Sequence, residues 1–505
     1  MSAKTVRIRL EPWSAEIVVP TGSQLMPALS ANGVEFPCGG TGICGGCRVR
    51  LLSGTLPISI EDKAAFRQDE IESGWRLACQ ARAEGPLVME CGQWRMDVLT
   101  DDSLLSGEGK QGLGVAVDLG TTTIAAQMID LGSGRVLGVR TALNPQMRAG
   151  ADVMSRIRAV LMGADLRNMV RSEIGAMISE LSGGRAQEIC EVLIVGNTVM
   201  HHLFCGLDVE PLAYAPFATP HLQMQQFTPV DLGWLLPDSC RIRFAACIGS
   251  FVGADTLAGI IASGIAEEEE LAALIDLGTN GEIAIGNRHG LVCASTAAGP
   301  AFEAGCIRMG MRAASGAIDH VALIEGEFKA TVIGDVEARG ICGSGVVDAI
   351  AGGLESGAIL PSGRVANGTK VFPVSGAVAL YQGDIRELQL AKAAIASGFS
   401  LLLDRLGVKA LDLKRIHLAG AFGNYVRIES AVRIGLVEAP TELIHASGNT
   451  ALRGAKMMLL AKEELALPLI EHVCLAAVPG FQDRFAACMS LPPRREQPTE
   501  TLVSR

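Results

Sequence analysis

The feature that most constrains the fold of this chain is a short pattern that occurs twice, 158 residues apart. It reads Asp118-Leu-Gly-Thr-Thr in the first copy and Asp276-Leu-Gly-Thr-Asn in the second. Each copy follows an apolar strand and leads into another strand, over residues 124–130 and 282–286. Because one strand–turn–strand unit is used twice, the sequence predicts two pseudo-equivalent halves that face a shared cleft.

The residues of the repeated turn suit a nucleotide. Glycine lets backbone N–H groups approach phosphate oxygens, and threonine hydroxyls add donors. Aspartate brings a carboxylate that can hold Mg²⁺ directly or through water. The chain has no P-loop and no G-x-G-x-x-G that opens a helix after a strand, which disfavours those nucleotide sites. We expect Asp118 and Asp276 to be catalytic, and the phosphate-binding residues to be Gly120, Thr121, Thr122, Thr123, Gly278, Thr279, Asn280 and Gly281.

Three further segments are candidates for the same cleft. Gly343-Ser344-Gly345 is a glycine-rich turn that we expect to open a helix, a position suited to phosphate or ribose. Gly420, Gly423 and Asn424 follow an apolar strand, and we expect this segment to cradle adenosine. Asp255 stands at the start of another predicted helix, where it would orient the hydrolytic water or Mg²⁺. The alternative for all three segments is a role in helix capping and tight packing.

A cysteine pattern near the N-terminus predicts an iron–sulfur cluster. Cys38, Cys44 and Cys47 lie in a glycine-rich loop, and Cys79 completes the spacing C-x5-C-x2-C-x31-C. A [2Fe–2S] cluster takes four thiolates, and here three come from one loop and the fourth from elsewhere. Zinc also takes four cysteines, but structural zinc sites usually use two closely spaced pairs. Because only one such pair occurs here, the pattern favours the cluster.

Both motif sets resemble known families. The cysteine loop resembles plant- and vertebrate-type [2Fe–2S] ferredoxins, which implies a β-grasp fold near the N-terminus. The paired Asp-Leu-Gly-Thr turns and the glycine segments resemble the acetate and sugar kinase/Hsp70/actin superfamily. That resemblance implies two RNase H-like halves that close over ATP. We therefore expect an α/β protein with a small α+β N-terminal domain.

The predicted domain boundaries follow from these motifs. Residues 1–95 are expected to form the ferredoxin-like domain, and residues 96–112 an acidic, Gly/Ser-rich linker. Residues 113–270 and 271–490 are expected to form the two ATPase halves. The proline-rich, polar tail 491–505 has the composition of a disordered segment.

The overall composition excludes several classes of function. Hydrophobic residues make up 49% of the chain and charged residues 19%, which suits large buried cores. The net charge of −11 argues against a general binder of nucleic acid or anionic membranes. The chain contains no apolar run of eighteen residues and no signal-peptide core at its N-terminus. We expect a cytoplasmic protein with no nucleic-acid or membrane partner.

The fusion of a ferredoxin domain with this type of ATPase resembles the reductive activators of corrinoid proteins. Strings that carry the resemblance are Asn144-Pro-Gln146 with Arg156, Gly196-Asn197-Thr198, Ala298-Gly-Pro-Ala-Phe-Glu303 and Gly310-Met-Arg312. The best-known members place an additional domain between cluster and ATPase, whereas only some seventeen residues intervene here, by the predicted boundaries. We expect the strings around Asn144 and Gly299 to face the partner or the nucleotide, or to pack the two halves together.

The resemblance implies ATP-dependent transfer of one electron to Co(II), which regenerates Co(I). The implied cofactors are a [2Fe–2S] cluster, ATP and Mg²⁺. The implied partners are a corrinoid protein of a methyltransferase system and an upstream low-potential electron donor. The oligomeric state is left open, with a homodimer as one option.

Three other functions are compatible with the motifs. A small-molecule kinase with a redox-sensing ferredoxin domain would use Asp255 as its base. An activator of a radical dehydratase shares the ATPase module but holds a [4Fe–4S] cluster between two subunits. An Hsp70-like switch would dock a partner and keep the cluster as a structural element. The separate cluster domain favours the corrinoid activator over these three.

Overall fold

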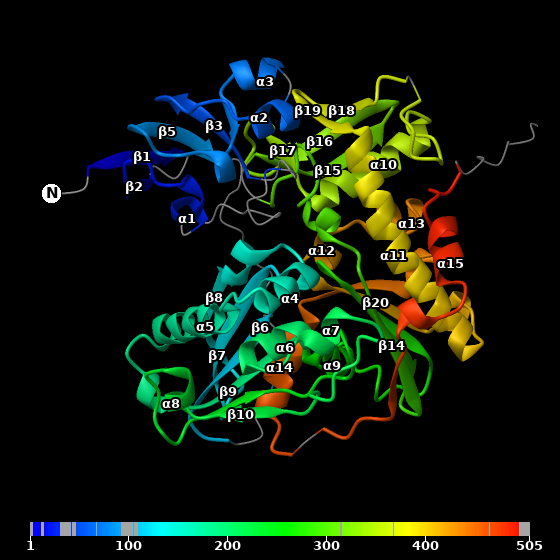
Figure 1. Cartoon of the computed structure of the whole chain (residues 1–505). Helices are drawn as coiled ribbons and strands as arrows, with labels where there is room; N and C mark the ends of the chain where they lie inside the picture. The colour runs from blue at the N-terminus through cyan, green and yellow to red at the C-terminus, as the bar shows by residue number, and fades with distance from the viewer. Residues whose placement is uncertain are drawn as a thin grey trace, which may run out of the picture.

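Three large sheets and two small ones organise the described part of the chain (Figure 1). The computed structural model describes residues 4–11, 15–30, 42, 47–66, 68–91, 105, 110–313, 316–366, 368–463 and 465–493. A five-stranded sheet forms the N-terminal domain, and two six-stranded sheets form the cores of a first and a second lobe. Most of the predicted linker and of the predicted tail lies outside the described residues.

The N-terminal domain is a mixed sheet in the order β2-β1-β5-β3-β4. Val6, Ile8 and Leu10 are buried while the residues between them are exposed, so the alternation of β1 defines its core face. β1 pairs antiparallel with β2 and parallel with β5, as the β-grasp expectation requires. The elements are β1 (Thr5–Glu11), β2 (Ala15–Pro20), α1 (Leu25–Ser30), β3 (Arg48–Ser53), α2 (Ile60–Ala65), α3 (Gln68–Glu72), β4 (Trp75–Leu77), η1 (Ala78–Gln80) and β5 (Leu87–Cys91).

The first lobe is built on a sheet in the order β10-β11-β9-β6-β7-β8. β6, β7 and β8 are antiparallel, whereas β9 runs parallel to both β6 and β11. β6 and β9 are apolar and almost wholly buried, as expected for strands covered on both faces. The elements are β6 (Leu113–Leu119), β7 (Thr123–Asp130), β8 (Val136–Leu143), η2 (Pro145–Ala149), α4 (Val153–Leu161), α5 (Leu166–Ser182), η3 (Ala186–Glu188), β9 (Ile189–Gly196), α6 (Thr198–Cys205), α7 (Glu210–Ala213), β10 (Gln225–Phe227), α8 (Pro229–Leu232) and β11 (Arg241–Phe244).

The second lobe repeats this arrangement, with a sheet in the order β21-β20-β12-β13-β14-β22. β12, β13 and β14 are antiparallel, and β20 runs parallel to β12 and β21. The predicted duplication is therefore confirmed in the order and direction of five strands, while the sixth strand, β10 in the first sheet and β22 in the second, lies at opposite edges. The elements are β12 (Ala272–Leu277), β13 (Gly281–Asn287), β14 (Gly290–Thr296), η4 (Pro300–Glu303), α11 (Gln382–Leu406), η5 (Ala410–Asp412), β20 (Arg415–Ala419), α12 (Gly420–Tyr425), α13 (Ile428–Arg433), η6 (Thr441–Leu443), β21 (Ile444–Gly448), β22 (Ile470–His472), η7 (Leu475–Ala477) and α15 (Phe481–Cys488).

Two helices join the lobes. α9 (Ala254–Ser263) contacts β12 of the second sheet and β9 of the first, and it packs against α14 (Thr450–Leu460). α14 in turn packs on β6 and β9, although it comes late in the sequence. None of the helices in the described part of the chain has the length and apolar character that a membrane crossing requires.

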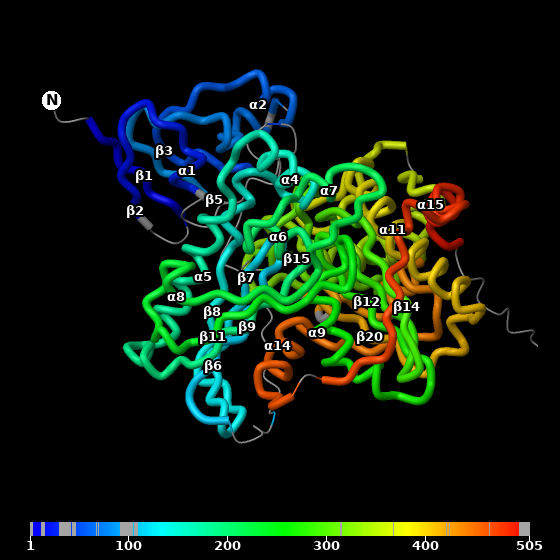
Figure 2. The backbone as a smooth tube through the Cα atoms, turned by 60° about the horizontal axis from the view of Figure 1, so that its bottom comes forward, coloured from blue at the N-terminus to red at the C-terminus, as the bar shows by residue number. Residues whose placement is uncertain are grey.

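A small β subdomain is inserted between β14 and β20 of the second lobe. It contains a three-stranded sheet in the order β16-β15-β17, the hairpin β18–β19 and a long helix. Its elements are β15 (Ala317–Ile324), β16 (Glu327–Val332), β17 (Gly340–Ile341), α10 (Gly343–Ser356), β18 (Val371–Ser375) and β19 (Val378–Tyr381). Figure 1 shows this subdomain beside the N-terminal domain. In Figure 2 the N-terminal domain projects from one corner of the molecule.

Candidate functional site

The two repeated turns line a single cleft with a free volume of about 210 Å³. The first turn joins β6 to β7, and the second joins β12 to β13. The structure brings together the predicted residues that line it: Asp118, Gly120, Thr121, Thr122, Thr123, Asp255, Asp276, Gly278, Thr279, Asn280, Gly343, Ser344 and Gly420. Three other predicted residues, Gly281, Gly345 and Gly423, do not line the cleft but are adjacent in sequence to residues that do. The structure does not describe the side chain of Asn424.

Five carboxylates line this cleft, and burial raises the pKa of four of them as follows. Burial raises the pKa of Asp118 and of Asp276 to about 7, and that of Asp255 to about 6. Burial also raises the pKa of Glu282, which the charges of Asp255 and Asp276 raise further. Glu282 is a lining residue that the sequence motif contained but to which we assigned no role. A divalent cation would relieve the repulsion within such a cluster.

The geometry of these carboxylates suits magnesium that is also held by phosphate. Among the described residues, no three Asp, Glu, His or Cys side chains lie close enough to form a metal site by themselves. Mg²⁺ typically keeps several waters and takes one or two carboxylates together with substrate phosphates. The donor set around Asp118 and Asp276 therefore fits Mg²⁺ that enters with a nucleotide.

Asn449 orients the first aspartate. Its side-chain amide donates to Oδ2 of Asp118 at 3.1 Å, and its Oδ1 caps α14 by accepting from the N–H of Leu452 at 2.8 Å. The sequence analysis missed Asn449, although an asparagine that follows a strand and precedes a helix is a typical N-cap. The helix cap fixes the side-chain amide of Asn449, and this amide in turn orients the carboxylate of Asp118.

Three side chains of the first lobe form hydrogen bonds with the first turn. Asn144 donates to the carbonyl oxygen of Gly120 at 2.9 Å, and Arg156 donates to that of Thr121 at 2.5 Å. Asn197 donates to the hydroxyl of Thr121 at 2.9 Å. The strings that contain these residues therefore support the nucleotide cleft.

Glu303 joins the two turns. Its two carboxylate oxygens accept hydrogen bonds from the hydroxyls of Thr122 at 3.0 Å and of Thr279 at 3.1 Å. The two hydroxyls themselves lie 2.9 Å apart. Burial raises the pKa of Glu303. The sequence analysis named Glu303 only as part of a family string, so this bridge is a new finding.

Gly420 brings the start of α12 against the second aspartate. It has φ +85°, and a Cβ at this position would lie 2.5 Å from both Oδ1 of Asp276 and the carbonyl oxygen of Leu277. Only glycine accommodates that approach together with a positive φ. The ring of Phe422, two residues on, stacks on Phe302 with 4.8 Å between centroids, and both rings line the cleft.

The described part of the cysteine motif brings together the segments of two predicted ligands. Cys47 and Cys79 are both buried, and the N–H of Ala78 donates to the carbonyl of Cys47 at 3.0 Å. Gly42 has φ +81°, and a Cβ there would meet Cγ of Glu61 at 2.9 Å, so Gly42 itself lies close to α2. Cys38 and Cys44 lie outside the described residues. Two buried thiols from a loop and a separate segment fit the expected cluster.

Family models match nearly the whole chain. The model of the 2Fe-2S iron-sulfur cluster binding domain matches residues 8–84. The model of the RACo middle region matches residues 113–268, and that of the C-terminal domain of RACo, the ASKHA domain, matches residues 270–503.

The corrinoid activation enzyme RamQ of Eubacterium limosum is 34% identical over 411 residues, which cover 74% of this chain and 69% of that protein. The chain belongs to this family of corrinoid-protein activators. The [Co(II) methylated amine-specific corrinoid protein] reductase of Methanosarcina barkeri is 28% identical, over 70% of this chain and 71% of that protein. A solved reductive activator for corrinoid,iron-sulfur protein superposes with a TM-score of 0.67 at 27% identity, over 97% of this chain and 98% of that one.

These matches confirm the predicted fold class. A [2Fe–2S] ferredoxin domain precedes a duplicated ATP-binding ASKHA module. The zinc interpretation of the four cysteines is thereby set aside.

Proposed function

We propose that this chain uses ATP to drive one electron onto a corrinoid protein, which converts Co(II) to Co(I). One observation carries the proposal: in a member of the activator family, buried Cys47 and Cys79 and the paired aspartate turns occur in one chain. An upstream low-potential donor would supply the electron, and the acceptor would be the corrinoid protein of a methyltransferase system. We expect this reaction in the cytoplasm.

The reaction needs ATP because the reduction potential of the Co(II) acceptor is lower than that of an ordinary ferredoxin. When bound, a plant-type [2Fe–2S] cluster supplies one electron at about −400 mV. Each further 100 mV costs an electron about 2.3 kcal/mol. Hydrolysis of ATP to ADP and phosphate covers such a deficit only if the protein has two states that differ in their affinity for nucleotide and acceptor.

The residues of the cleft have distinct proposed roles. Asp118 and Asp276 would hold Mg²⁺, which would neutralise phosphate charge. Their neighbours in the two turns would donate N–H and hydroxyl groups to the phosphates. Asp255 would orient the attacking water. The segment at Gly420 and Phe422 would enclose the adenosine.

The proposed role of the cysteines is to hold the cluster. Cys38, Cys44 and Cys47 would supply three ligands from the loop, and Cys79 the fourth. The buried positions of Cys47 and Cys79 keep water away from that side of the site. Exclusion of water lowers the dielectric around such a centre and thereby tunes its potential.

The test is a reduction assay under strict anoxia. The reduced protein is mixed with a Co(II) corrinoid protein, and the Co(I) absorbance is followed with and without Mg-ATP. We expect Co(I) only when Mg-ATP is present, and none from Cys47→Ala or Asp118→Asn. Intact ATP hydrolysis and a reducible cluster without Co(I), across several corrinoid proteins, would overturn the proposal. A phosphorylated small molecule would instead support the kinase.

A further inference from the structure

One loop connects the nucleotide cleft to the N-terminal domain. We call residues 303–312 the strap. Glu303 and Gly305 line the cleft at one end of the strap, and Met311 and Arg312 line it at the other. The strap therefore leaves the cleft and returns to it, with Arg308 between the two ends.

The two ends of the strap carry opposite charges. Glu303 accepts hydrogen bonds from the hydroxyls of Thr122 and Thr279, which are donors that a phosphate would also use. Arg312 faces the same cleft with a cationic group. A nucleotide that brings negative phosphates would repel the first end and attract the second. Binding therefore acts on the strap from both ends.

Arg308 fixes the middle of the strap to the second lobe. Its backbone N–H donates to Oδ1 of Asp384 at 2.8 Å, and its guanidinium lies 4.4 Å from the ring centroid of Tyr381. Asp384 also accepts from the N–H of Tyr381 at 2.8 Å. The position of Arg308 is thus set by two contacts, one with α11 and one with β19, and the hydrogen bond between Tyr381 and Asp384 ties the two partners together.

The same residue holds the N-terminal domain. The guanidinium of Arg308 forms an ion pair with Glu70 of α3, and its carbonyl oxygen accepts from Nη1 of Arg48 at 2.6 Å. Arg48 directly follows Cys47, is 8% exposed and stacks on Trp75 at 4.1 Å. Glu70 lies within 3.5 Å of Arg48 as well. A partly buried charged contact therefore begins one residue from Cys47, a proposed cluster ligand.

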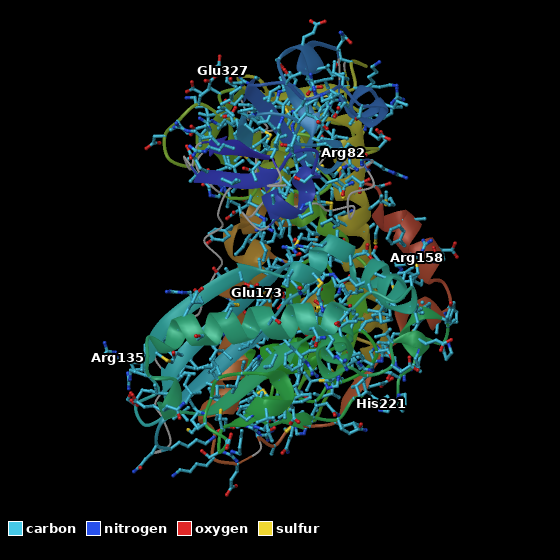
Figure 3. All side chains as sticks on the ribbon, turned by 60° about the vertical axis from the view of Figure 1, so that its left-hand side comes forward. Arg82, Arg135, Arg158, Glu173, His221 and Glu327 are labelled. Carbon is cyan, nitrogen blue, oxygen red and sulfur yellow. The ribbon has the colours of Figure 1, made fainter. Side chains whose placement is uncertain are left out.

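Figure 3 shows the N-terminal domain and the inserted subdomain at the same end of the view. Arg82 of the N-terminal domain and Glu327 of the inserted subdomain lie in the upper part of the view, away from Arg135, Glu173 and His221 of the first lobe. A second ion pair, between Glu90 and Arg339 at 3.2 Å, joins the N-terminal domain to the subdomain. Its arginine side chain is 44% exposed, so this pair contributes little by itself.

We propose that Arg308 is a positioning residue through which nucleotide in the cleft sets the placement of the cluster-bearing domain. The inference rests on the proposed function, since it gives the route by which ATP acts on electron transfer. A shift of the strap would carry Arg308 with it. The contact of Arg308 with Arg48 and Glu70 would then shift or break. Because Cys47 directly precedes Arg48, its position would change as well.

Hydrogen exchange tests this on the full chain, without a corrinoid protein. We expect a non-hydrolysable ATP analogue with Mg²⁺ to change exchange by about fivefold in both the strap and α3 of the wild-type protein. In Arg308→Ala the change in the strap should remain while the change in α3 is lost. Glu70→Gln removes the same ion pair from the N-terminal domain and leaves the second lobe unchanged. It should likewise keep the change in the strap and lose the change in α3. Arg308→Lys should restore part of the response.

Arg339→Ala is the matched control, because it removes the other ion pair between the N-terminal domain and the subdomain. It should keep the wild-type response. The absorption spectrum reports whether each variant retains its cluster, and the affinity for the analogue should stay within about twofold in all of them. A response in α3 that survives both Arg308→Ala and Glu70→Gln would overturn the inference. That result would leave Co(I) formation by the wild type, and so the proposed function, untouched.

Discussion

The two phosphate turns have nearly the same sequence and backbone, yet their surroundings differ. The first turn is held by Asn144, Arg156 and Asn197, all from its own lobe. Glu303, which begins the strap, accepts hydrogen bonds from both turns, through Thr122 of the first and Thr279 of the second. Both copies therefore contact the strap, and the first copy is held in addition by three side chains of its own lobe.

The aspartates of the two turns differ in the same way. Asp118 receives a hydrogen bond from Asn449, which a helix cap holds in place. Asp276 instead meets the backbone at Gly420, with space for no larger residue. The first aspartate is thus oriented by a side-chain hydrogen bond, whereas the second lies against backbone.

Removal of either carboxylate gives the largest expected effect. We expect Asp118→Asn and Asp276→Asn each to lower the rate of ATP hydrolysis by about 10²-fold or more, because each loses the negative charge that would hold Mg²⁺ beside the phosphates. Steady-state phosphate release would measure this. A loss in only one variant would show that the turns do not share the cation, which would break the comparison.

The close approach at Gly420 has the next largest expected effect. Gly420→Ala should lower the free energy of unfolding by about 2 kcal/mol or more, because a Cβ would strain the backbone and collide with Asp276. Gly357→Ala is the matched control, since Gly357 also has a positive φ, of +77°, but no atom within 4 Å of the new Cβ. Urea unfolding of both variants compares them. Equal losses would show that the collision contributes nothing.

Protons should compete with magnesium in the cleft. The pKa values of Asp118 and Asp276 rise from 3.8 to about 7, so in the nucleotide-free protein their protonated forms stabilise the fold. That contribution is complete below the ordinary value of 3.8 and is lost as pH rises through about 7. Mg-ATP needs the ionised forms and should bind about tenfold more weakly at about pH 6 than at about pH 8.

Calorimetry in buffers of different ionisation enthalpy would measure the protons released on binding. Asp118→Asn should show a smaller dependence on pH than the wild type. An affinity that is the same at both pH values would contradict the assignment of these carboxylates to Mg²⁺.

The bridge formed by Glu303 has the smallest expected effect on affinity. Glu303→Gln keeps the shape but removes the charge that competes with phosphate, so Mg-ATP should bind about fivefold more tightly. The same variant should show a weaker nucleotide response in α3. Glu188→Gln, at an exposed ion pair with Arg185, is the control and should change neither property. Weaker binding in Glu303→Gln would indicate that Glu303 assists the nucleotide.

The sequence predicted the parts of the site that are local. Each aspartate turn stands between its own two strands, and Cys47 and Cys79 follow a recognised spacing, so short segments were sufficient. The contacts that organise the site are not local. Glu303 lies 181 positions from Thr122, and Asn449 lies 331 from Asp118. Such pairs are set by the packing of the two lobes, which no single segment encodes.

The contact between Arg48 and Arg308 was missed for the same reason. The two residues are 260 positions apart, and arginines in such settings look like ordinary surface charges in the sequence. The ion pair with Glu70 becomes visible only when the N-terminal domain lies against the inserted subdomain. The glycine-rich turn at Gly343 marked only the start of α10, and no motif indicated that the subdomain lies against the N-terminal domain.

The nucleotide dependence of a single electron transfer tests the central claim most directly. Chemically reduced protein would be mixed in a stopped-flow instrument with a Co(II) corrinoid protein, and Co(I) followed with Mg-ATP, with Mg-ADP and without nucleotide. The account predicts Co(I) with Mg-ATP alone, at a level that does not exceed one per cluster oxidised. Equal Co(I) formation under all three conditions would contradict it, because ATP would then have no part in the transfer.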